Sequence, residues 1–127
     1  MSNNGKKKIG LIGLGDMGIG LAKNIMASGF ALSGFDLSQS RLDVLAGLGG
    51  NAAGSISEAA DGADAVFVMV LNGKQVQDVV LAEGGLLSSM LPGSVIIISA
   101  TISPSEIEVI AGPVSYTHLR AHETKPN

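Results

Sequence analysis

The sequence contains no cysteine, no tryptophan and few other aromatic residues, and each absence excludes a class of function. Without cysteine there are no disulfide bonds, thiolate zinc sites or cysteine nucleophiles, and a reducing cytoplasm is the expected compartment. Only three phenylalanines and one tyrosine are present. No basic stripe accompanies them, so the chain lacks both the stacking surface and the positive charge of a nucleic-acid binder. We therefore expect no nucleic-acid partner.

The sequence also lacks a long hydrophobic run. Its longest unbroken apolar stretch, Ala65 to Leu71, is far shorter than the ~20 residues of a membrane-spanning helix. Three lysines near the beginning precede an apolar segment and imitate a signal peptide, but Gly13, Gly15 and Asp16 interrupt that segment. We expect neither a membrane partner nor secretion.

Charged residues are scarce as well, at 15% of the chain, and the formal net charge is only -3. Hydrophobic residues make up 46% of the 127 positions, which is enough to build one folded domain and argues against disorder. Glycine, in contrast, is abundant, with 18 residues. A chain with so much glycine needs many tight turns and close backbone contacts, so the position of each glycine is informative.

Short apolar runs bounded by glycine alternate with segments of helical spacing along the chain. The strands are predicted at Lys8–Leu14, Ala31–Asp36, Asn51–Ala53, Ala65–Leu71 and Ser94–Ser99. The helices are predicted over Met17–Ser28, Ser38–Leu48, Ile56–Asp61, Lys74–Leu81 and Leu86–Leu91, and a further helix begins at Ser103. Right-handed crossovers arrange this alternation as a parallel sheet with helices on both faces. The fold class is a doubly wound α/β sheet of Rossmann type, truncated after about five strands.

The first predicted strand leads into a G-x-G-x-x-G motif that opens the first predicted helix. Its six residues are Gly13, Leu14, Gly15, Asp16, Met17 and Gly18. In this context the first glycine permits the turn, the second lets backbone approach a pyrophosphate, and the third lets helix pack on strand. The helix N-terminus then offers N–H groups to the phosphates. The motif predicts a dinucleotide site, and a glycine turn without a ligand is the alternative.

Asp36 ends the second predicted strand, where dinucleotide-binding folds place the acid that binds the adenosine ribose hydroxyls. A carboxylate there repels a 2'-phosphate, so the sequence favours NAD over NADP. Ser38, Ser40 and Arg41 lie just beyond and are able to accommodate a phosphate, which keeps NADP open. An ordinary helix cap is the alternative role for Asp36.

The segment Gly10 to Gly18, followed by Ala22 and Asn24, closely resembles the opening of the β-hydroxyacid dehydrogenases. That family includes 3-hydroxyisobutyrate dehydrogenase, tartronate semialdehyde reductase and L-threonate dehydrogenase. Two later segments, Val68 to Val76 and Ile98 to Pro104, are also similar to family segments. The resemblance covers about residues 8 to 110 and implies an NAD-binding domain of an oxidoreductase. Hydride would pass between the nicotinamide and a small hydroxy acid, in a parent protein expected to be a homo-oligomer.

The resemblance also implies further site residues. Val70, Leu71 and Gln75 match positions that border the nicotinamide half of the cofactor, and Thr101 matches a threonine that contacts cofactor and substrate. Leu71 replaces the proline of many members, and Ala100 replaces a serine, so this chain departs from the family on the substrate side. From the residues alone, an equally good interpretation is that the Thr101 hydroxyl forms a hydrogen bond with a backbone group of its own loop.

No position matches the family's catalytic lysine, which lies in a later helical domain. We therefore expect no catalytic residue in this chain, and this segment alone is expected to be inactive. A stand-alone, non-catalytic NAD(P)-binding module remains the alternative function.

Residues 1–112 form the predicted dinucleotide-binding domain, and residues 113–127 are expected to be a non-native or disordered tail. The segment Val114 to Thr124 resembles translated sequencing-adapter read-through. His118 and His122 in this tail have a spacing suited to one metal ion, but a site needs a third ligand and a supporting shell. We expect no metal site.

Overall fold

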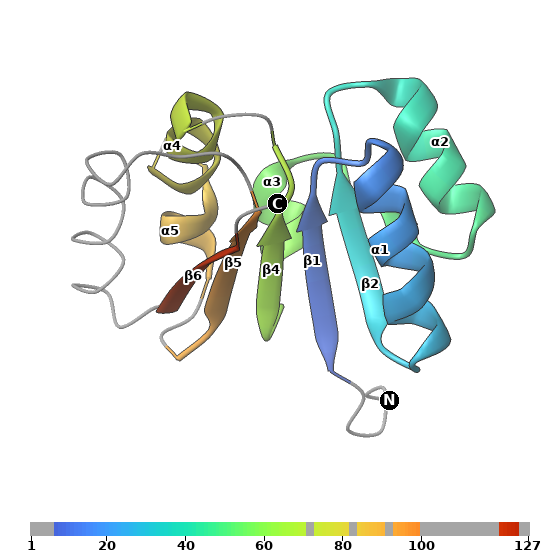
Figure 1. Ribbon diagram of the computed structural model, residues 1–127, viewed down its shortest axis with the longest axis horizontal. Coiled ribbons are helices and arrows are strands. Elements are labelled where there is room, and N and C mark those ends of the chain that lie inside the picture. Colours follow the sequence, from blue (N-terminus) through green and yellow to red (C-terminus); the bar gives the residue numbers. More distant parts are fainter. Residues whose placement is uncertain (1–6, 71–72, 82–83, 91–92, 100–119, 125–127) are drawn as a thin grey trace.

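A computed structural model describes residues 7–70, 73–81, 84–90, 93–99 and 120–124. In these residues the chain forms one parallel sheet with the strand order β3-β2-β1-β4-β5-β6 (Figure 1). The strands are β1 (Lys8–Ile12), β2 (Ala31–Phe35), β3 (Asn51–Ala52), β4 (Ala65–Val68), β5 (Val95–Ser99) and β6 (Arg120–Thr124). Every neighbouring pair is parallel, as expected for strands joined by helical crossovers.

Helices cover both faces of the sheet. They are α1 (Asp16–Ala27), α2 (Gln39–Gly47), α3 (Ile56–Ala60), α4 (Gly73–Leu81) and α5 (Leu86–Ser89). Figure 1 shows α1 and α2 on the right, on the β2 side, while α3 lies behind the sheet and α4 and α5 lie toward the β5 side. The predicted doubly wound α/β fold is therefore confirmed.

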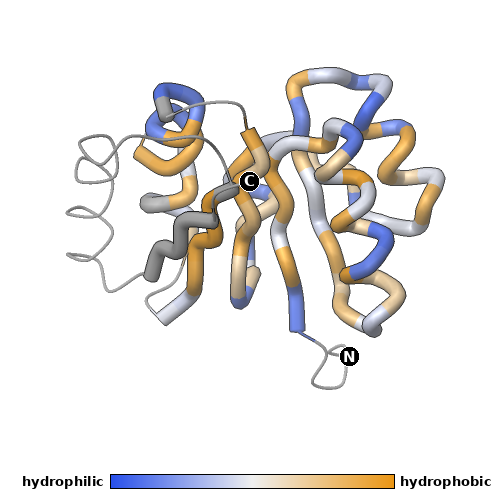
Figure 2. The backbone as a smooth tube through the Cα atoms, viewed as in Figure 1, coloured by the Kyte–Doolittle hydropathy of each residue, from blue (hydrophilic) through white to orange (hydrophobic). Residues whose placement is uncertain are grey.

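Two buried apolar clusters, one on each face of the sheet, form the core. Successive residues of a strand point to opposite faces, so Leu11 belongs to the cluster under α1 and α2, and Ile12 to the cluster under α3, α4 and α5. Val66 and Val68 join the second cluster and are fully buried. The strands at the centre of the sheet are accordingly among the most hydrophobic parts of the backbone in Figure 2. This rigid centre holds the strand ends that form the site.

The sheet contains one strand that the sequence did not predict. β6 pairs with β5 from Val95↔Arg120 to Ser99↔Thr124, within the segment that was expected to be a tail. The difference has a simple physical reason, because without β6 the apolar strand β5 would present a row of unpaired N–H and C=O groups, which readily accept another strand. The helix predicted to begin at Ser103 lies outside the described residues.

The side chains of Ser55 and Glu58 form a variant of the capping box at the start of α3. Ser55 Oγ accepts a hydrogen bond from the Glu58 N–H at 3.1 Å, as expected for an N-cap residue. Glu58 Oε1 accepts instead from the Gly54 N–H at 2.8 Å, one residue before the cap. Two backbone donors at the start of this short helix are thus satisfied by side chains.

Substituting Ser55→Ala is expected to lower the free energy of unfolding by about 1 kcal/mol, because the Glu58 N–H loses its acceptor. Urea unfolding followed by circular dichroism measures the change. Ser57→Ala is the matched control: its hydroxyl lies 3.4 Å from that of Ser55, and we expect a smaller loss. Equal losses in both variants would show that the cap does not hold the helix.

Across the described ranges, no helix combines the length and the apolar character needed to cross a membrane. In the same part of the chain, the His, Asp and Glu side chains form no group of three suited to holding a metal ion.

Candidate cofactor site

The carboxyl ends of β1, β2 and β4 meet at one edge of the sheet. The chain order reverses between β1 and β4, since β2 and β3 lie on one side of β1, and β4, β5 and β6 lie on the other. Such a switch point leaves a crevice between loops that run in opposite directions, and open α/β sheets bind their ligands there. The glycine motif and Asp36 both lie at this edge, as the sequence predicted.

Gly13 and Gly18 are required by the packing of the loop itself. Gly13 has a φ of 101°, and a Cβ atom on it would lie 2.1 Å from the carbonyl oxygen of Met69. A Cβ atom on Gly18 would lie 2.2 Å from the carbonyl oxygen of Gly13. Neither position has room for a side chain, so these two glycines let the loop pass between β4 and the first turn of α1.

Gly15 differs from both of these glycines. As the N-cap of α1 it has a φ of -68° and a ψ of -170°, which is extended backbone open to any residue. The nearest atom to an added Cβ is Arg41 Nη1, at 3.8 Å, which is ordinary contact with a flexible side chain. Neither backbone strain nor crowding by the residues that the structure describes therefore accounts for a glycine here. The first N–H groups of α1 follow directly, and such groups have no acceptor within their own helix.

The carboxylate of Asp36 is fixed by backbone groups from two segments. Oδ2 accepts the Leu14 N–H at 2.8 Å, and Oδ1 accepts the Ser38 N–H at 2.8 Å. The side chain is 12% exposed, and Arg41 Nη1 lies 3.8 Å from Oδ2. The alternative role as a helix cap is realised only in part, because Ser38 is the N-cap of α2 and Asp36 binds its N–H from two residues before. Asp36 thus connects the end of β2 to the glycine loop and keeps acceptor capacity on both oxygens.

These residues border a hollow of about 610 Å³. Its lining comes from the ends of β1, β2 and β4 and from the helices α2, α3 and α4. The lining residues are Ile12, Gly13, Gly15, Phe35, Asp36, Leu37, Arg41, Ile56, Met69, Val70, Gln75, Asp78 and Val79. Most of the lining is apolar with a few polar groups, which is the composition of a small-molecule site.

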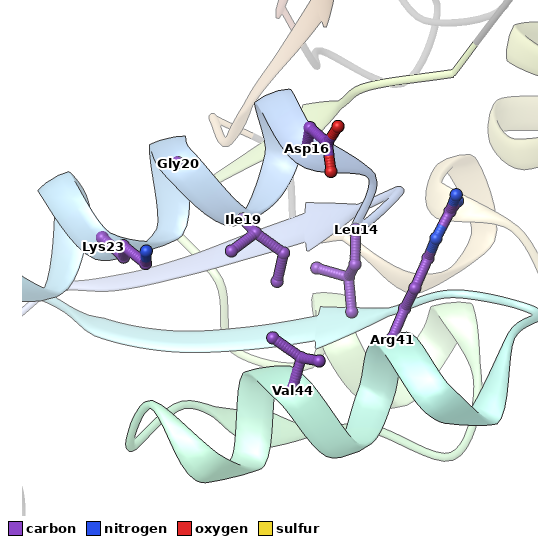
Figure 3. Close-up of a pocket in the computed structure, with 7 residues that line it drawn as sticks. All are labelled: Leu14, Asp16, Ile19, Gly20, Lys23, Arg41 and Val44. Atoms are coloured by element: carbon purple, nitrogen blue, oxygen red, sulfur yellow. The ribbon is translucent and has the colours of Figure 1, made fainter.

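A second, smaller hollow of about 330 Å³ lies between α1 and α2 (Figure 3). Leu14, Ile19 and Val44 supply its apolar surface. Asp16, the first residue of α1, also lines this hollow, next to the glycine loop. Figure 3 shows Arg41 extending from α2 past Leu14, and this arginine borders both hollows.

The structure brings together five of the predicted site residues in the larger hollow and places four others outside its lining. Gly13, Gly15, Asp36, Val70 and Gln75 line the larger hollow. The remaining residues are dispersed: Leu14 and Asp16 line the smaller hollow, Gly18 packs against Gly13, and Met17 has a side chain that is 67% exposed and lines neither of the two hollows. Leu71 and Thr101 lie outside the described residues.

Seven lining residues were not predicted from the sequence as site residues: Ile12, Phe35, Leu37, Ile56, Met69, Asp78 and Val79. Leu37 follows Asp36 and is 95% exposed, so its position just beyond a strand end was the available signal. Ile56 lies on α3 and Val79 on α4, and both read in the sequence as helix residues. Only the packing of α3 and α4 behind the strand ends brings them to the same hollow.

With this geometry established, comparison with known proteins identifies the family. Residues 8–122 match the family model described as the NAD binding domain of 6-phosphogluconate dehydrogenase. The chain belongs to this family. The predicted NAD-binding domain is confirmed, and so is the resemblance to the hydroxyacid dehydrogenases, because relatives with such names match over most of the chain.

Two curated relatives and one solved structure show the extent of the similarity. The NAD-binding domain is 38% identical to an NAD-dependent L-serine dehydrogenase of Pseudomonas aeruginosa and 35% identical to an L-threonate dehydrogenase of Cupriavidus necator, over 82% of this chain in both cases. The crystal structure of a 3-hydroxyisobutyrate dehydrogenase from Salmonella typhimurium superimposes with a TM-score of 0.84 at 32% identity, over 91% of this chain. The chain spans 35% of the length of both curated relatives and 40% of the solved chain.

Proposed function

We propose that the larger hollow holds NAD and that this domain serves a dehydrogenase acting on a small hydroxy acid. The observation that carries the proposal is Gly15. Its backbone conformation suits any residue and its Cβ direction is uncrowded, so nothing in the described part of the chain accounts for glycine there. A ligand that needs contact with the backbone does account for it, and pyrophosphate is such a ligand. The residues present therefore fit the cofactor.

The first turn of α1 would hold the pyrophosphate. Its free N–H groups and the positive end of the helix dipole favour an anion at Gly15. Asp36 would bind the adenosine ribose, because each carboxylate oxygen accepts one backbone N–H and has a further lone pair for a ribose hydroxyl. The same backbone bonds orient the carboxylate before the cofactor arrives.

The apolar residues around Asp36 would hold the adenine ring. Leu37 is almost fully exposed, and Ile56 and Val79 face the same hollow from α3 and α4. A flat ring inserted among them removes apolar surface from water, which favours binding. Val70 and Gln75 lie on the β4 side of the hollow, and from the resemblance we propose that they, with Leu71 and Thr101, border the nicotinamide.

When bound, the nicotinamide supplies the hydride chemistry. The part of this chain that the structure describes would contribute cofactor binding and orientation, and a general acid or base for the substrate hydroxyl is expected in the remainder of the whole protein. The relatives support the substrate class, since they are named for L-serine, L-threonate and 3-hydroxyisobutyrate. Their names also favour an oxidoreductase over a stand-alone binding module. A homo-oligomeric parent and a cytoplasmic location remain proposals, the latter supported by the absence of cysteine.

Asp36→Ala is expected to weaken NAD binding by about tenfold to one hundredfold, because the ribose loses charge-assisted hydrogen bonds. Isothermal titration calorimetry with the purified chain measures the dissociation constants. Asp43→Ala is the matched control, since this carboxylate lies on the same side of the sheet on α2, where it accepts from Gln39 Nε2 at 3.0 Å, and it does not line the larger hollow. Equal affinity of the Asp36 variant and the wild type would place the ribose elsewhere.

A further inference from the structure

The smaller hollow between α1 and α2 lies outside the proposed position of NAD. Of the residues that line it, only Arg41 also lines the larger hollow. Figure 3 shows Ile19 of α1 and Val44 of α2 extending toward each other, with Lys23 further along α1. A volume of about 330 Å³ is sufficient for a small ligand.

Gly20 lies inside α1 and lines the smaller hollow. Glycine destabilises the interior of a helix relative to alanine, because it loses more backbone freedom on folding. Gly18 is required by its contact with the carbonyl oxygen of Gly13, but a Cβ atom on Gly20 would have no neighbour within 4 Å among the described residues. A ligand that lies against the backbone of α1 would account for glycine at this position.

Apolar side chains in the smaller hollow remain open to solvent. Val44 is 50% exposed, and Ile19 is half-buried. Both lie beside the buried side chain of Leu14, so together they form an apolar floor. Covering such a surface with an apolar group removes it from water and favours binding. The body of a ligand in this hollow is therefore expected to be apolar.

Lys23 provides an unpaired positive charge at one end of the smaller hollow. It is exposed, and among the described residues it makes no hydrogen bond or ion pair. It follows Ile19 by four residues and Gly20 by three, which places the three residues on one face of α1. Asp16, which would repel an anion, lies at the other end of the hollow, next to the glycine loop (Figure 3). An acid group is therefore favoured at the Lys23 end.

We propose that the smaller hollow is a second binding site, which takes a small carboxylate with an apolar chain. The chain would lie between Ile19 and Val44, against the backbone of α1, and the carboxylate would bind the ammonium group of Lys23. Arg41 is the less suitable partner, because its Nη1 already lies 3.8 Å from the carboxylate of Asp36. A charge-assisted hydrogen bond to the lysine fixes the acid group, and the apolar contacts add affinity. The proposal does not depend on NAD binding in the larger hollow.

A titration of the full ¹⁵N-labelled chain with three probes, followed through backbone amide chemical shifts, tests the proposal. Hexanoate has both an acid group and an apolar chain. Hexan-1-ol has the chain without the charge, and acetate has the charge with almost no chain. Hexanoate is expected to shift the amides of Gly20, Lys23 and Val44 in a saturable way, and to bind at least about fivefold more tightly than either of the other probes.

Two substitutions, each with a matched control, assign the site. Lys23→Ala is expected to weaken hexanoate binding by about tenfold, while Lys74→Ala removes a lysine that lines neither hollow and should leave binding unchanged. Gly20→Leu is expected to abolish saturable binding, because its side chain would fill the hollow. Gly47→Leu is its control, since a Cβ atom on this helical glycine also has no neighbour within 4 Å and Gly47 does not line the hollow.

Weaker binding in Lys23→Ala and Gly20→Leu, with both controls like the wild type, supports the proposal. No saturable shift at tens of millimolar hexanoate, equal affinity for hexan-1-ol, or affinity that survives either substitution overturns it. Lys23→Ala alone decides if Gly20→Leu does not fold. Shifts centred on Gly15 and Asp36 also overturn the proposal, because they place the probe in the larger hollow. The titrations with NAD test the proposed function separately, so either proposal can fail without the other.

Discussion

Gly15→Val is expected to weaken NAD binding by at least about one hundredfold while changing the free energy of unfolding by no more than about 1 kcal/mol. The fold tolerates the side chain, because the backbone of Gly15 is extended and the nearest atom to its Cβ is 3.8 Å away. Bound NAD, in contrast, is expected not to tolerate the valine side chain. The isopropyl group would occupy the approach to the first N–H groups of α1, and each charge-assisted hydrogen bond lost from the pyrophosphate costs about 1.5–3 kcal/mol.

Two measurements on the same preparation test this prediction: a calorimetric titration with NAD and a urea unfolding curve. Gly20→Ala is the matched control on α1, since a Cβ atom there has no neighbour within 4 Å and Gly20 does not line the larger hollow. This control should bind NAD as the wild type does and gain about 0.5–1 kcal/mol from helix propensity. Unchanged NAD affinity in Gly15→Val would contradict the proposed position of the pyrophosphate.

Gly18→Ala is expected to have the opposite signature and to lower the free energy of unfolding by about 2–3 kcal/mol. Alanine in place of glycine normally stabilises a helix, but here the added Cβ would lie 2.2 Å from the carbonyl oxygen of Gly13. Gly13 has little freedom to retreat, because a φ of 101° and the carbonyl oxygen of Met69 already confine it. Either α1 or the loop must shift away from the sheet.

Urea unfolding curves of Gly18→Ala and Gly20→Ala, compared side by side, make the sign of the effect diagnostic. Both substitutions are identical in chemistry and lie two residues apart on α1. If Gly18→Ala stabilised the domain as Gly20→Ala is expected to, the close contact between the helix and the glycine loop would be absent in solution.

The sequence predicted the location of β1 to β5 because short apolar runs mark most of these strands, although it extended the first strand to Leu14 and the fourth to Leu71, beyond the observed ends of β1 at Ile12 and of β4 at Val68. β1 ends at Ile12 before Gly13, and β2 ends at Phe35 before Asp36. Strand and helix alternate, and a right-handed crossover leaves little choice of topology, so the order of β1 to β5 followed as well. The glycine motif directly follows the end of β1, and Asp36 directly follows the end of β2. Local spacing therefore sufficed to predict that the motif and Asp36 meet at one edge of the sheet.

Features that depend on contacts between distant segments were not predicted in the same way. The pairing of β6 with β5 depends on an open sheet edge, which no local pattern in 120–124 indicates. Within the glycine motif, spacing alone could not show that Gly15 faces an open hollow while the Met17 side chain extends into solvent. That difference arises from the direction in which α1 leaves the sheet.

We propose that NAD lies across the carboxyl ends of β1 and β2, with its pyrophosphate at Gly15. A titration of the ¹⁵N-labelled chain with NAD, followed through backbone amide chemical shifts, tests the claim most directly. We expect the largest changes at the N–H groups from Gly15 to Gly18 and from Asp36 to Ser38. The amides of Gly29, Gly62 and Gly93, in turns that precede β2, β4 and β5 at the opposite edge of the sheet, should not move. No change at millimolar NAD, or changes centred on those three glycines, would contradict the account.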